Sequence, residues 1–117
     1  WIYVGDHVDA LCLILENGKN FATYNIGGDN EWSNKNVVHK ICALLDEMVP
    51  RKNGRPYQDL IKHIKDRPGH DFRYAIDNKE IYEQLHWAPR MSFEEGLKKT
   101  VAWYVGRYYE GDHSSGR

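Results

Sequence analysis

The sequence predicts a mixed α/β fold in which short strands alternate with four main helices. Three short runs, at residues 2–4, 22–26 and 60–64, are rich in the β-branched and aromatic residues typical of strands. Four longer segments place apolar residues three or four positions apart, as an amphipathic helix requires. Because the two kinds of segment alternate within 117 residues and no internal repeat occurs, we expect one α/β domain.

The first helix is expected to begin at Asp6, directly after the opening strand. An aspartate at this place can cap a helix by accepting a hydrogen bond from a backbone N–H of the first turn. Gly18 is expected to end the helix. Its apolar positions are Val8, Leu11, Cys12, Ile14 and Leu15.

The second strand, 22–26, runs into Gly27-Gly28, a pair that permits a sharp exit. Ser33 then has the properties of an N-cap for the clearest amphipathic helix of the chain, which Pro50 ends. The apolar positions of this helix are Val37, Val38, Ile41, Leu44, Leu45 and Met48.

Residues 51–59 contain Gly, Pro and charged residues without periodicity, which indicates an exposed loop. The strand at 60–64 should follow it and lead into Asp66-Arg67-Pro68-Gly69-His70-Asp71. Asp77 with Glu80, and Ser92 with Glu95, have the spacing of capping boxes, so two further helices are expected to start there. Residues 110–117 form a polar tail that we expect to be disordered.

Composition excludes several classes of partner. The chain has 16 Lys and Arg against 17 Asp and Glu, so no overall positive field attracts nucleic acid or an anionic membrane. No apolar run approaches the roughly 20 residues that span a bilayer. Cys12 and Cys42 lie within helical apolar patterns and are expected to be buried free thiols, which fits the cytoplasm. The six histidines have no metal-binding spacing, so we expect no metal.

The segment Asp66–Asp71 combines a turn with groups that bind anions. Pro68 fixes its own φ, and Gly69 lets the backbone approach a ligand closely. Arg67 can hold a phosphate or carboxylate through two parallel hydrogen bonds, with His70 as a second donor. The alternative is a surface turn in which Arg67 pairs with Asp66 or Asp71.

Catalytic motifs are absent from the sequence. It contains no Gly-x-Gly-x-x-Gly, no P-loop, no Tyr-x-x-x-Lys and no Gly-x-Ser-x-Gly. We therefore expect no catalytic and no cofactor-binding residue in this chain. Asn34, just inside the helix capped by Ser33, lies where the helix dipole favours an anion, although ordinary polarity of a first turn would also explain it.

Three segments together resemble one family of enzymes. Residues 1–7 (WIYVGDH), 24–28 (YNIGG) and 66–71 (DRPGHD), the last followed by RYAID at 73–77, are similar in order and spacing to the C-terminal part of the dTDP-glucose 4,6-dehydratases, which are extended short-chain dehydrogenases/reductases. The likeness continues through LHWAP at 85–89 and KKTVAWY at 98–104. Gly5 departs from it, because an acidic residue is expected there.

The resemblance implies that residues 1–109 are the substrate-binding lobe of such an enzyme, with 110–117 as the tail and an N-terminal NAD-binding Rossmann domain missing. The full-length enzyme would be a cytoplasmic homodimer that converts dTDP-glucose to dTDP-4-keto-6-deoxyglucose and water with bound NAD, in deoxysugar and lipopolysaccharide biosynthesis. The chain alone would be inactive.

The same resemblance assigns contacts with the nucleotide-sugar to Asn34, Asp66, Arg67, Pro68, Gly69 and His70. Arg67 would neutralise diphosphate charge, His70 would donate to phosphate or sugar oxygens, and Asp66 would support one of the two, because a carboxylate facing a diphosphate is repelled.

Two other functions remain open on the sequence: a related NAD-dependent sugar-nucleotide epimerase or decarboxylase, and a non-catalytic module that binds sugar nucleotides. In each case helices that pack on an absent domain would expose apolar surface, so we expect the chain to self-associate.

Overall fold

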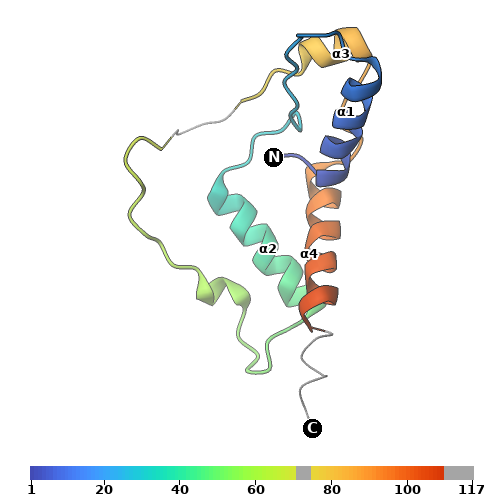
Figure 1. Cartoon of the computed structure of the whole chain (residues 1–117). Coiled ribbons are helices and arrows are strands. Elements are labelled where there is room, and N and C mark those ends of the chain that lie inside the picture. The colour runs from blue at the N-terminus through green and yellow to red at the C-terminus, as the bar shows by residue number, and fades with distance from the viewer. Residues whose placement is uncertain (71–74, 110–117) are drawn as a thin grey trace. The chain divides into compact units, whose positions relative to one another are not determined.

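The computed structural model describes residues 1–70 and 75–109 and is helical (Figure 1). These residues group into two compact units, one made of 1–31 and 75–96 and the other of 32–70 and 97–109. No helix in the described part of the chain is long and apolar enough to cross a membrane. The elements in chain order are α1 (Val4–Asn17), α2 (Asn34–Met48), the 3₁₀ helix η1 (Tyr57–Leu60), α3 (Lys79–Leu85) and α4 (Phe93–Tyr109).

The predicted strands are wrong for the residues that the structure describes. Residues 2 and 3 precede α1 without regular structure, 22–26 form no strand, and 60–64 begin in η1 and continue without regular structure. A strand satisfies its backbone groups only through a neighbouring strand, whereas a helix satisfies them internally. Residues with strand composition therefore stay irregular here, because no described segment pairs with them.

Helix α1 begins earlier than predicted, and Asp6 does not cap it. Tyr3 is the residue before the helix, and Gly18 follows its end as expected, with the Gly18 N–H bonded to the Ile14 carbonyl at 2.8 Å. Asp6 is buried inside the helix, where its carboxylate accepts a hydrogen bond from the backbone N–H of Met91 at 2.9 Å. The aspartate thus fixes the chain just before α4.

Helix α2 has the predicted boundaries. The Ser33 hydroxyl accepts a hydrogen bond from the Asn36 N–H at 3.2 Å, which confirms the cap. Of the two cysteines, Cys42 is partly buried in α2, but Cys12 in α1 is exposed, so the prediction that both are buried is wrong for Cys12.

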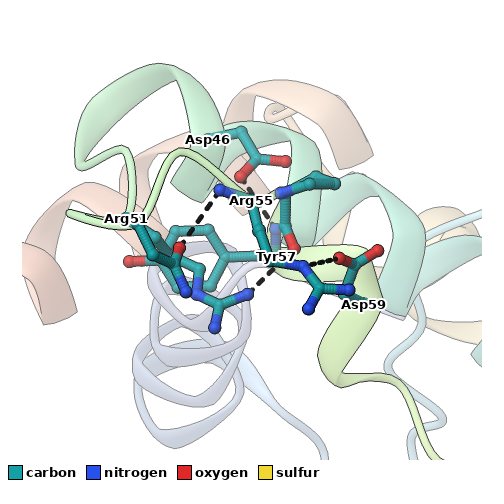
Figure 2. A network of polar contacts seen from close by, with 7 residues as sticks. Asp46, Arg51, Arg55, Tyr57 and Asp59 are labelled. Carbon is teal, nitrogen blue, oxygen red and sulfur yellow. Dashed lines mark hydrogen bonds and ion pairs between the residues drawn. The ribbon is translucent and has the colours of Figure 1, made fainter.

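The loop after α2 is anchored by Tyr57 (Figure 2). The Tyr57 N–H donates to the Asp46 carboxylate at 2.9 Å, and the Tyr57 hydroxyl donates to the Val49 carbonyl at 2.9 Å. Because that hydroxyl has a single proton, the Tyr109 hydroxyl 2.9 Å away must donate to it.

Two arginines of the same loop complete the network in Figure 2. The Arg51 guanidinium donates to the Pro56 carbonyl at 3.2 Å, and Arg55 pairs with Asp59 at 2.9 Å. The loop is exposed, as predicted, but it is held against α2 at one end and closed by its own side chains.

Helices α3 and α4 occur where the capping boxes predicted them, but only one box forms. At α4 the Ser92 hydroxyl accepts from the Glu95 N–H at 3.2 Å, and the Glu95 carboxylate accepts from the Ser92 N–H at 3.3 Å. At α3 the Asp77 carboxylate instead accepts from the Lys79 N–H at 2.9 Å, and Glu80 bonds to Gln84. The helix therefore starts two residues later than Asp77.

The core of the first unit is small. Ala10 of α1, Ile81 of α3 and Trp87 are buried together, and six partly buried residues pack around them: Ile2, Leu13, Ile14, Tyr24, Ile26 and Leu85. Full burial of a side chain such as Ile81 stabilises a fold by about 1.5–3 kcal/mol. A core of this size leaves the unit dependent on its buried hydrogen bonds.

Asn78 supplies those bonds. Its side chain accepts from the Gly27 N–H at 2.6 Å and donates to the Gly27 carbonyl at 2.9 Å and to the Asp29 carboxylate at 2.6 Å. A Cβ on Gly27 would lie 2.9 Å from the Ile76 Cβ, so only glycine allows this approach. The amide thereby joins segments 51 residues apart in the sequence.

Replacing Asn78 with Ala should lower the free energy of unfolding by about 2–4 kcal/mol, since it leaves the buried Gly27 backbone groups without partners. Urea unfolding followed by circular dichroism measures the change. Asn36→Ala, which removes an exposed amide on α2, should cost less than about 0.5 kcal/mol. Equal effects of the two substitutions would contradict the role of Asn78.

Replacing His86 with glycine should stabilise the folded chain. It ends α3 in the left-handed region, with φ 53° and ψ 30°, where a Cβ is strained. We expect His86→Gly to raise the free energy of unfolding by about 0.5–1 kcal/mol, and Glu83→Gly, inside the same helix, to lower it by about 1 kcal/mol. Losses of similar size for both would show that His86 is not strained.

Candidate functional site

The segment predicted to bind an anion forms a tight turn. The Arg67 carbonyl accepts a hydrogen bond from the His70 N–H at 3.4 Å, with Pro68 and Gly69 as the two central residues. Gly69 has φ 72°, the value that the second central residue of a type II turn requires and that glycine adopts without strain. Proline followed by glycine therefore specifies this turn locally.

The Asp66 carboxylate closes the turn from outside. Its Oδ1 accepts from the Arg67 backbone N–H at 2.8 Å and from the His70 Nδ1–H at 2.7 Å. The bond from His70, and after it the bond from Arg67, hold the pKa of Asp66 below its ordinary value. With Nδ1 engaged, the imidazole presents Nε2 to other groups.

The Arg67 guanidinium is available for an anion. Its side chain is exposed, and it forms no hydrogen bond or ion pair with residues 1–70 or 75–109. The alternative in which the Arg67 side chain pairs with Asp66 is wrong, because only the Arg67 backbone contacts that carboxylate. Asp71, the other alternative partner, lies outside the described residues.

Asn34 is exposed at the first position of α2, as predicted. The Ser33 hydroxyl occupies only the Asn36 N–H, which leaves other backbone N–H groups of this turn directed outward. Within the described residues no hydrogen bond joins Asn34 to the turn at 66–70, so the structure brings Asp66, Arg67 and His70 together but not Asn34.

A groove of about 400 Å³ in the first unit was not predicted. Its lining consists of Trp1, Gly27, Gly28, Asp29, Asn30, Glu31, Ala75 and Ile76. The charged side chains among them are both carboxylates, which repel a diphosphate. The Gly27-Gly28 pair predicts a sharp turn at this place but not a groove. Asn78 holds Gly27 and Asp29 in the wall of the groove, and no local sequence signal indicates this long-range role. Among the described residues no cluster of His, Cys, Asp and Glu is placed to hold a metal ion.

The family model described as GDP-mannose 4,6 dehydratase matches residues 1–100. A dTDP-glucose 4,6-dehydratase of Escherichia coli is 50% identical over 105 residues, which are 90% of this chain and 28% of the relative. One of Haemophilus influenzae (strain ATCC 51907 / DSM 11121 / KW20 / Rd) is 47% identical over 107 residues, 90% of this chain and 32% of the relative. The chain therefore spans about a third or less of the length of these relatives.

A solved structure of Bacillus anthracis dTDP-glucose 4,6-dehydratase in complex with NAD has a similar fold. The TM-score is 0.76 with 37% sequence identity, and the match covers 93% of this chain and 31% of the other.

Replacing His70 with Ala should raise the pKa of Asp66 toward its ordinary value, because the largest cause of its depression is removed. Because the pKa of Asp66 is lower in the folded chain than in the unfolded chain, its bonds stabilise the turn fully at pH values above the unfolded-state pKa. This stabilisation is lost as the pH falls through the folded-state pKa of Asp66. The ¹³C shift of the Asp66 carboxyl against pH measures this. His39→Ala, on α2, should leave the titration unchanged, and an unchanged titration in His70→Ala would show that the bond is absent in solution.

Proposed function

The chain belongs to the GDP-mannose 4,6 dehydratase family, and from this premise we propose that it is the substrate-binding part of an NAD-dependent dTDP-glucose 4,6-dehydratase. Its relatives named for that activity, at 46–50% identity over 90% of the chain, support this choice of substrate. Both the family description and these names specify a dehydratase, which favours loss of water over epimerisation or decarboxylation.

One observation supports the proposed site. In the turn at 66–70 the Arg67 guanidinium is unpaired among the described residues, because the Asp66 carboxylate bonds to the Arg67 backbone N–H and to His70 instead. An arginine next to an aspartate would ordinarily be neutralised by it. Here Asp66 bonds to a backbone N–H and to His70, so the Arg67 guanidinium is available to pair with a diphosphate.

The other residues have complementary roles in the proposal. His70, held through Nδ1 by Asp66, directs Nε2 at a phosphate or sugar oxygen. Asn34 contributes an amide and the outward N–H groups of the first turn of α2. Pro68 and Gly69 fix the backbone so that the ligand can approach it. Asp66 acts through His70 and does not contact the substrate.

The residues of this chain do not fit an NAD site. The sequence has no glycine-rich phosphate-binding loop, and the groove beside Gly27 and Gly28 carries two carboxylates. We therefore assign NAD to a Rossmann domain outside these residues, and residues 1–109 to the substrate lobe. The catalytic groups belong to that other part, so this chain alone should not convert dTDP-glucose.

The complete enzyme would act as a homodimer in the cytoplasm and supply deoxysugars, including those of lipopolysaccharide. The free thiols of Cys12 and Cys42 fit a reducing compartment.

Isothermal titration of the chain with dTDP tests the site. We expect Arg67→Ala to weaken binding by tenfold or more, because a hydrogen-bonded charge pair contributes about 1.5–3 kcal/mol. Arg55→Ala should leave the affinity unchanged, since the Arg55 guanidinium is already paired with Asp59.

Wild-type affinity in Arg67→Ala would overturn the role of that residue. Absence of dTDP binding to the wild-type chain at millimolar concentration would overturn the proposal that this part holds the nucleotide. Equal affinity for dTDP and UDP would remove the reason to prefer dTDP-glucose over UDP-sugars.

A further inference from the structure

The two units of the chain carry opposite net charges. Residues 32–70 and 97–109 contain 11 Lys and Arg against 4 Asp and Glu, whereas residues 1–31 and 75–96 contain 3 against 10. The near balance of charge in the whole chain arises from these two opposite parts. A diphosphate is therefore attracted to the second unit and repelled by the first. The turn at 66–70, which carries the proposed substrate site, belongs to the second unit.

Free positive charge is concentrated directly before this turn. The segment 61–66 runs without regular structure from η1 to the turn (Figure 1). Its two lysines, Lys62 and Lys65, are exposed, and neither forms a hydrogen bond or ion pair with another described residue. The neighbouring carboxylate of Asp66 is bonded to His70 and to the backbone instead. No acidic residue that the structure describes therefore neutralises the two lysines.

Both lysines lie close enough to the turn for their charge to act there. Two residues span at most about 7 Å of chain and five residues at most about 18 Å, which limits the Cα distances from Arg67 to Lys65 and to Lys62. Salt screens charges over about 10 Å at 0.1 M and over about 30 Å at 0.01 M. At low salt, an anion that approaches Arg67 is consequently within the field of both lysines.

The exposure of the two lysines decides which step of binding they affect. An exposed ion pair adds little to the stability of a complex, because water screens it and two long side chains must be ordered. A local positive field, by contrast, raises the rate at which an anion arrives by about 10- to 1,000-fold. Lys62 and Lys65 should therefore act on the association of a ligand and leave the bound state almost unchanged.

We propose that Lys62 and Lys65 steer the diphosphate of the substrate to the turn at 66–70 and thereby set its rate of association. The inference rests on the proposed substrate site, to which it adds two residues. Arg67 and His70 hold the ligand after it has arrived. The residues that steer and the residues that hold are thus different, and their roles can be tested separately.

Stopped-flow fluorescence with dTDP that carries an N-methylanthraniloyl group on its 3′-hydroxyl measures both rate constants. In about 0.01 M salt we expect Lys62→Gln combined with Lys65→Gln to lower the association rate constant about tenfold. The dissociation rate constant should stay within about twofold of the wild-type value. In about 1 M salt, where screening acts over about 3 Å, the variant and the wild type should associate at the same rate.

Two further variants separate charge from contact. Lys62→Arg combined with Lys65→Arg keeps both positive charges and should associate with dTDP at the wild-type rate. Arg67→Ala removes a group that holds the ligand, so its main effect should be a dissociation rate constant raised by about tenfold or more.

An unchanged association rate in the double glutamine variant at low salt would overturn the proposal, as would a decrease that persists at high salt or that also occurs in the double arginine variant. Faster dissociation with unchanged association would make the two lysines contacts of the bound ligand and overturn steering. Absence of dTDP binding to the wild-type chain would refute both the proposed site and the steering. Wild-type dissociation in Arg67→Ala, with slower association in the double glutamine variant, would refute only the role of Arg67.

Discussion

The first unit depends on one buried amide. Asn78 satisfies both backbone groups of Gly27 and also bonds to Asp29, and these contacts hold residues 27–29 beside the start of α3. A core centred on Ala10, Ile81 and Trp87 is too small to impose this arrangement by apolar burial alone. The side chain thus acts in place of the backbone ladder that a pair of strands would provide.

Asp6 of α1 makes a similar contact with the segment before α4. Its buried carboxylate accepts from Met91, one residue before the capping box of Ser92 and Glu95. Each of these long-range contacts joins a side chain, inside α1 for Asp6 and directly before α3 for Asn78, to the backbone of an irregular segment. In a domain of small core, such bonds decide where loops lie, and the groove beside Gly27 and Gly28 is one result.

Local rules predicted what depends on local sequence. The cap of Ser33, the box of Ser92 and Glu95, and the end of α1 at Gly18 each involve groups within four residues of one another. The turn at 66–70 was predictable for the same reason, since Pro68 and Gly69 determine its type. Strands failed because pairing is not local, and the roles of Asp6 and Asn78 were missed because their partners lie 85 and 51 residues away.

The proposed site shows how a short sequence can prepare a charge for a ligand. Binding is weakened by the ordering that it imposes, and the turn has already undergone most of that ordering through Pro68 and the bonds to Asp66. The same carboxylate that could have neutralised Arg67 is turned to the backbone and to His70 instead. A glutamate at position 66 would place its oxygens one methylene further out, where they could no longer make both bonds without leaving the turn and would be free to pair with the guanidinium.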